Sequence, residues 1–157
     1  MADPLIDYFA GEKRESMIFT CAGVAAIAVA VWLWTTPWRG AVYPLVIFGL
    51  IHLAVGGAIY LRTDLQVATV EAARQEAPAS LRGDERARMK VVVRNFRIYR
   101  WVELAVIALG LVLVWRYADR PTWYAAGVGC IAEGAVTLVL DLFAEARADR
   151  YLRWLST

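Results

Sequence analysis

Histidine and cysteine are scarce in this sequence, which has one His and two Cys among 157 residues. The cysteines, Cys21 and Cys130, form no C-x-x-C pair, so neither zinc binding nor redox chemistry is indicated. Haem binding would normally require a second axial ligand in addition to His52, the only histidine of the sequence. The E-x-x-H pattern of carboxylate di-iron bundles is also absent. We therefore expect no cofactor and no metal ion.

Charged residues are also few. They make up 20% of the chain and hydrophobic residues 60%, whereas an average soluble domain is about 45–50% apolar. The formal net charge of +2 is too small to favour nucleic acid, so we expect no nucleic-acid partner. What the chain has in abundance is long apolar runs, which are typical of membrane spans.

Four apolar runs are long enough to cross a bilayer: 16–35, 40–61, 98–117 and 121–143. Each has about the 20 residues that a helix needs to span a hydrocarbon core of about 30 Å, and none shows the strict alternation of a membrane β-strand. The first run follows a segment with several acids and exceeds the apolar core of a signal peptide, so we do not expect it to be cleaved.

The connections after the first and third runs are short, which makes the joined helices antiparallel neighbours. The sequence therefore predicts an all-α fold, an integral membrane four-helix antiparallel bundle formed by a single domain, 1–157. Fourteen of the 17 Lys and Arg residues lie on the side of the two termini. The positive-inside rule then predicts that both termini are cytoplasmic.

The two terminal segments carry predictions of their own. We expect 1–15 to form a separate helix that ends near Gly11 and lies in the interface of the inner leaflet, because its apolar residues fall on one side. A frayed terminus is the alternative. The tail, 144–157, is predicted to be cytoplasmic.

Between spans two and three, the chain is predicted to form a cytoplasmic helical hairpin, 62–97. Its first arm continues span two, and Pro78 and Gly83 are expected to break the chain before a second arm capped by Asp84. An apolar stripe on the second arm recurs at helical spacing: Met89, Val93 and Phe96. Such a stripe needs a partner, and we expect the end of span two to provide it.

Ionisable residues inside the spans are the candidate functional groups. His52 lies 12 residues after Gly40, and Glu133 lies 12 residues after Pro121, so each sits about 18 Å below the outer border. Spans two and four run in the same direction, which gives the two side chains one depth. Each residue also begins an i, i+4 stripe on one helix face. The two stripes are His52, Gly56, Tyr60 and Asp64, and Glu133, Thr137, Asp141 and Glu145.

A second polar layer is predicted near the cytoplasmic border, formed by Arg100, Glu103 and Asp141 with Tyr60 as a further candidate. Exposing an acid to lipid at the bilayer centre costs at least about 2.5 kcal/mol, so both layers should face the bundle interior. Two interpretations remain open. Intramembrane ionisable groups mark pathways or binding sites, and a Glu–His pair could hold one shared proton. Alternatively, the layers are satisfied polar contacts that fix helix register.

Four segments carry a resemblance to a known group: "DPLIDYFAGEKRES", "YLRTD", "RNFRIYRWVE" and "DLFAEARADRY". In these segments the chain resembles uncharacterised small four-span proteins of bacterial inner membranes. The resemblance implies a bacterial inner-membrane location and supplies no functional residues.

Three function classes follow from these observations. The first is a non-catalytic membrane protein with an interaction, accessory or immunity-type role, which binds a protein or lipid partner. Membrane lipid and a homo-oligomer are further possible contacts, since small residues in the spans permit close helix approach. The alternative is a proton-linked small transporter or oligomeric channel that uses Glu133 and His52. An enzyme comes third, because no hydroxyl or thiol can be placed at the depth of the single histidine.

Overall fold

Four long helices make up nearly all of the chain. The computed structural model describes residues 4–76 and 78–156, with the side chains of 5–72 and 82–156. The helices are α1 (Pro4–Leu33), α2 (Val42–Glu76), α3 (Pro78–Arg116) and α4 (Pro121–Trp154), and a short 3-10 helix, η1 (Arg39–Ala41), precedes α2. No strand occurs within these described residues. The predicted all-α fold is therefore confirmed.

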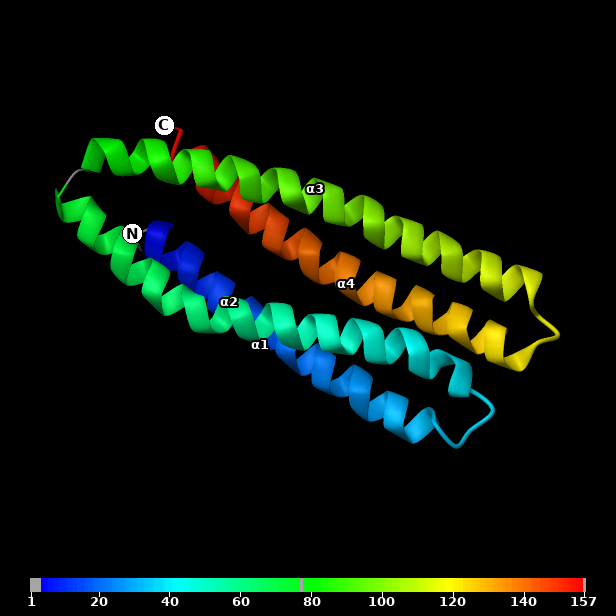
Figure 1. Cartoon of the computed structure of the whole chain (residues 1–157). Helices are drawn as coiled ribbons and strands as arrows, with labels where there is room; N and C mark the ends of the chain where they lie inside the picture. Colours follow the sequence, from blue (N-terminus) through cyan, green and yellow to red (C-terminus); the bar gives the residue numbers. More distant parts are fainter. Residues whose placement is uncertain (1–3, 77, 157) are drawn as a thin grey trace.

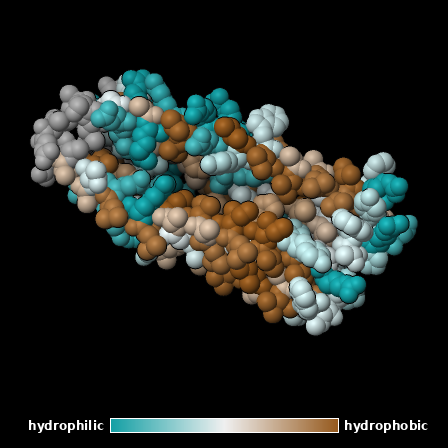
Figure 2. Space-filling view, in the orientation of Figure 1, coloured by the Kyte–Doolittle hydropathy of each residue, from teal (hydrophilic) through white to brown (hydrophobic). Residues whose placement is uncertain are grey.

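All four long helices are long and apolar enough to cross a membrane. Large apolar side chains lie on the outside of every helix, where water would make their exposure unfavourable, and examples are Val31, Leu61, Trp115 and Phe143. Hydrophobic residues cover much of the middle of the face drawn in Figure 2, and hydrophilic residues gather toward the two ends. This distribution is the one expected of a multi-pass membrane protein.

The two ends of the molecule differ in what they contain. The start of α1, the end of α2, the start of α3 and the end of α4 lie at one end in Figure 1, and the α1–α2 and α3–α4 connections lie at the other. We call the first the basic end, because it holds most of the Lys and Arg residues, and the second the loop end. Each helix therefore runs between the basic end and the loop end.

Helix α4 is the central element. Helix α1 packs along α2, and α3 packs along α4, while α4 also contacts α1, α2 and η1 (Figure 1). By contrast, α3 has few contacts with α2, and among the described residues its backbone does not approach that of α1. The fold is thus a tight α1–α2 pair joined through α4 to an outer helix, α3.

Small residues close the loop end. Ala26 and Ala30 of α1 pack with Ala41 of η1, the start of α2 and Ala125 of α4 in one buried apolar cluster. Beside it, the backbone of Gly40 approaches Thr122 so closely that a Cβ atom at Gly40 would overlap the Thr122 carbonyl group. Close backbone approach of this kind needs residues with minimal side chains.

The prediction of a separate N-terminal helix that ends near Gly11 is wrong. Helix α1 runs without a break through this glycine, and Tyr8 and Phe9 are buried in protein instead of facing a lipid leaflet. A glycine inside a helix costs about 1 kcal/mol relative to alanine, which tertiary packing readily offsets. Here the missing side chain also leaves room for the aliphatic part of Arg147.

The predicted hairpin turn is also wrong in its details. Helix α3 already begins at Pro78, so Gly83 and Asp84 lie inside the helix and Asp84 caps nothing. Proline suits the first position of a helix because its missing N–H would have no partner there, and one glycine is not enough to break a long helix. Residue 77, between the two helices, lies outside the described residues.

The basic end contains a core to which all four helices contribute. Met89 of α3 has none of its surface exposed, and it belongs to a buried cluster formed by Leu5, Tyr8, Phe9, Val70, Ala148, Tyr151 and Leu155. From the predicted partner of the Met89 stripe, the end of α2, the described side chains in this core are Val70 and the partly buried Val67. The region predicted as a two-arm hairpin, an interfacial N-terminal helix and a cytoplasmic tail therefore forms a four-helix layer.

Candidate functional site

The single histidine lies at the contact between α2 and α4. His52 is 1% exposed, and its Nε2 atom lies 3.0 Å from the hydroxyl oxygen of Thr137. Its other ring nitrogen, Nδ1, lies 4.0 Å from Oε2 of Glu133, a residue that is 6% exposed. The structure thus brings together His52 and Glu133, which the sequence placed at one depth, and adds Thr137 as a third member. We call these three residues the central site.

Two aromatic rings also pack against the histidine. Phe19 of α1 meets the imidazole edge to face, with ring centroids 5.5 Å apart, and Phe48 of α2 does so at 6.4 Å. Rings of this kind offer no hydrogen bond to the imidazole nitrogens. The polar partners of His52 among the described residues therefore come from α4.

The second predicted polar layer is divided between two contacts. The carboxyl groups of Glu103 on α3 and Asp141 on α4 lie within hydrogen-bonding reach of each other. Arg100 forms an ion pair with Glu145 of α4 instead of pairing with Glu103 three residues further along its own helix. Glu103 is 4% exposed, and its Oε2 atom has no hydrogen-bond partner, so a hydrogen bond between the two carboxyl groups would require a proton on one of them.

Tyr60 does not belong to this layer. Its ring lies under the ammonium group of Lys13, whose Nζ atom is 4.8 Å from the ring centroid. Lys13 also forms an ion pair with Asp64 at 2.7 Å, which joins α1 to α2. Tyr60 and Asp64 therefore secure the α1–α2 pair and are separate from the α3–α4 contact.

Helix α4 carries polar groups of both layers in one row of residues spaced four apart. Glu133 and Thr137 meet His52 of α2, Asp141 meets Glu103, and Glu145 meets Arg100. Each step of four residues turns the row by about 40°, so over about 18 Å along the helix it passes from the side that faces α2 to the side that faces α3. We call this row the α4 polar stripe, and it runs from the central site toward the basic end.

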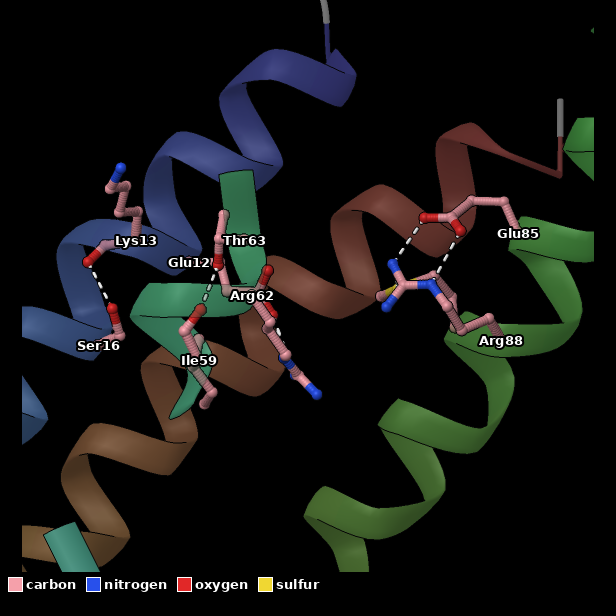
Figure 3. Close-up of polar contacts among 9 residues, drawn as sticks. Glu12, Lys13, Ser16, Ile59, Arg62, Thr63, Glu85 and Arg88 are labelled. Atoms are coloured by element: carbon pink, nitrogen blue, oxygen red, sulfur yellow. Dashed lines mark hydrogen bonds and ion pairs between the residues drawn. The ribbon is translucent and has the colours of Figure 1, made fainter. Parts of the chain in front are cut away.

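The basic end holds a set of charged contacts that the sequence did not reveal. Figure 3 shows Glu12 of α1 beside Arg62 of α2, with an O–N distance of 3.7 Å, and Glu85 bonded to Arg88 on α3. Arg147 of α4 pairs with Glu15 of α1 and lies over the ring of Tyr8. Only the Glu85–Arg88 pair, three residues apart on one helix, has a spacing that could have been recognised in advance.

The acid groups do not gather into a metal-binding set. Within the described part of the chain, no group of three or more His, Cys, Asp and Glu residues is placed to hold a metal ion. What the site offers chemically is proton binding at two depths. The central site combines an imidazole with a carboxyl group, and the Glu103–Asp141 pair combines two carboxyl groups.

No protein-family model matches this chain, and no curated protein and no solved structure was found to be similar to it.

Proposed function

We propose that this chain is a four-span protein of the bacterial inner membrane, an antiparallel bundle with both termini and the basic end in the cytoplasm. Four helices of sufficient length and apolarity support the membrane assignment. The excess of Lys and Arg at the basic end supports the orientation, since cytoplasmic segments carry more of these residues. Trp34 and Trp38 at the loop end suit the opposite membrane border.

Within that membrane, the proposed role is non-catalytic binding of a partner, of the interaction, accessory or immunity type. The observation that carries this proposal is the outer position of α3, whose principal neighbour is α4. Its other faces present large apolar side chains: Leu104, Leu109, Leu111, Val112 and Trp115. A membrane helix of another protein, or the acyl chains of a bound lipid, could pack against this uncovered surface.

The test is photocrosslinking in native membranes. A photoreactive amino acid replaces Ala108, which is exposed on α3, and a matched variant carries it at Val24, which is exposed on α1. A discrete protein adduct at Ala108 that is absent at Val24 would support a protein partner. Enrichment of one lipid at Ala108 would identify a lipid partner. Equal, diffuse lipid adducts at both positions would rule out a specific partner on α3.

A second candidate function is proton-linked transport, and the α4 polar stripe favours it. The stripe connects the central site to the basic end, and such intramembrane ionisable groups are typical of proton relays. The test is proton flux into liposomes that contain wild-type protein or Glu133→Gln, with the oligomer mass measured alongside. Flux that the substitution abolishes would support transport through the central site, and the absence of flux in both proteins would leave partner binding as the function.

A further inference from the structure

The hydrogen bonds of Thr137 determine which nitrogen of His52 carries a proton. The Thr137 hydroxyl donates to the carbonyl oxygen of Glu133, one helical turn back, at 2.8 Å. A hydroxyl group has a single hydrogen, so when Thr137 gives it to that carbonyl, the Thr137 oxygen accepts in its 3.0 Å contact with Nε2 of His52. Nε2 therefore carries the donated hydrogen, which leaves Nδ1 as the nitrogen that is bare when the imidazole is neutral.

Nδ1 of His52, which carries no hydrogen when the imidazole is neutral, is available to bind a proton. Nδ1 of His52 is buried and has no hydrogen-bond partner, and the nearest acid oxygen is Oε2 of Glu133 at 4.0 Å. Among the described residues, Glu133 is the titratable group that meets this histidine, because α1 and α2 present the rings of Phe19 and Phe48. The proton content of the pair thus depends on these two groups alone.

Electrostatics limits the pair of His52 and Glu133 to one bound proton. With no proton, a buried carboxylate would face the lone pair of Nδ1, and with two protons an imidazolium would face a neutral acid. Both states leave an unpaired charge in an apolar environment, which is costly. With one proton, the pair is either two neutral groups or an ion pair, and both of these are compensated.

We propose that His52 and Glu133 form a binding site for a single exchangeable proton, with the imidazole tautomer fixed by Thr137. The proton resides either on Oε2 of Glu133 or on Nδ1 of His52. Moving it from the acid to the ring breaks one O–H bond, forms one N–H bond and leaves the net charge of the pair unchanged. This site is the one that the transport candidate uses, but it can bind a proton whether or not transport occurs.

The surroundings of the site also define the side from which the proton arrives. Toward the loop end, the cluster around Ala26 and Ala125 and the backbone contact of Gly40 fill the interior. Toward the basic end, the α4 polar stripe continues to the Glu103–Asp141 pair, and the charged groups near that pair are Arg100, Glu145 and Glu15. Proton exchange is therefore assigned to the basic end.

Nitrogen NMR of protein labelled with ¹⁵N-histidine tests the tautomer directly, because the chain contains one histidine. In proteoliposomes we expect Nε2 to give the resonance of a protonated nitrogen across the neutral pH range. Thr137→Val removes the acceptor and should produce a mixture of tautomers. Thr63→Val is the matched control, because Thr63 is also buried and also donates to a carbonyl oxygen one turn back, that of Ile59 at 2.7 Å. A bare Nε2 in the wild type would overturn the assignment.

The proton count is tested by combining this NMR signal with the infrared band of a protonated carboxyl group, identified as the band that Glu133→Gln removes. The occupancies of Nδ1–H and of protonated Glu133 should add up to one over the neutral range. If the variant does not fold, the ¹³C carboxyl resonance of Glu133 in the wild type gives the same occupancy. A sum near zero or near two would contradict a one-proton site.

The side of access is tested by changing the pH on one side of oriented membrane vesicles. We expect the Nδ1 and Glu133 signals to respond to the pH at the basic end, and a response to the pH at the loop end alone would overturn the assigned path. The outcomes for site and transport are distinguishable. If the NMR and infrared signals show one proton but no flux is detected, the transport function is rejected and the proton site is supported. If flux is detected without the one-proton signals, the proton site is rejected and transport must use other residues.

Discussion

The carbonyl group of Thr122 occupies the space that any side chain at Gly40 would need. This contact joins the start of α2, through η1, to the first turn of α4 at the loop end. Because the obstructing atoms belong to the backbone, no rotation of a side chain can make room. The contact therefore sets how closely α2 and α4 approach, and with it the distance between His52 and Glu133 further along the same helices.

Gly40→Ala should accordingly destabilise the protein. Overpacking typically costs about 1–3 kcal/mol, and separating two backbones should place this change at or above the upper end of that range. Thermal unfolding in detergent measures the loss. Gly57→Ala is the matched control, since a Cβ atom there meets no other atom within 4 Å and alanine is the better helix former. Equal stability of the Gly40→Ala variant and the wild type would show that the loop end is looser than described.

Phe9 tests whether the N-terminal segment belongs to the folded core. Its side chain is 2% exposed in the cluster around Met89, and replacing a buried phenylalanine by alanine costs about 3–5 kcal/mol. We expect Phe9→Ala to lower the unfolding temperature strongly and to make α1 accessible to protease. Ile6→Ala changes a neighbouring residue that is 52% exposed and should have little effect. Similar small effects for both variants would restore the interfacial helix that the sequence predicted.

The sequence defined the spans better than the segments outside them. Span length follows from hydrophobicity alone, and counting residues from the outer border placed His52 and Glu133 at one depth, where the structure brings them within 4.0 Å. The apolar residues near Phe9 were ambiguous, because either a lipid leaflet or a protein core could bury them. The core that does so includes Met89 and Tyr151, which are remote in sequence and carry no local signal of the contact.

The rotation of each helix about its own axis was a second property that could not be predicted from the sequence. Arg100 lies three residues before Glu103, a spacing that suits a pair on one helix, and yet its partner is Glu145. Which face of α3 meets α4 depends on packing along the whole contact, including the close approach of Gly110 to Gly127. Depth along a membrane helix can therefore be read from sequence, whereas rotation about its axis requires the structure.

Arg147 should be the most sensitive charged residue at the basic end. Its side chain is mostly buried, where it pairs with Glu15 and covers the ring of Tyr8. Removing one member of a buried ion pair leaves the other uncompensated and typically costs about 3–5 kcal/mol. We expect Arg147→Ala to lower stability to that extent in denaturant unfolding. Arg150→Ala replaces an exposed arginine three residues further along α4 and should be nearly neutral. The double variant Arg147→Ala with Glu15→Gln should recover part of the loss, and a lack of recovery would show that the pair is not the cause.

The proposed orientation in the membrane can be tested with reporter proteins fused at the two ends of the bundle. Excess Lys and Arg at the basic end should retain that end in the cytoplasm, together with both termini. A fluorescent protein fused after Thr157 should therefore be bright, and alkaline phosphatase at the same position inactive. Alkaline phosphatase inserted between Asp119 and Arg120, in the α3–α4 connection, should be active because that connection lies on the opposite side. The reverse pattern would invert the molecule in the membrane, and the α4 polar stripe would then exchange protons with the outside instead of the cytoplasm. These fusions therefore determine which compartment can supply the proton bound between His52 and Glu133.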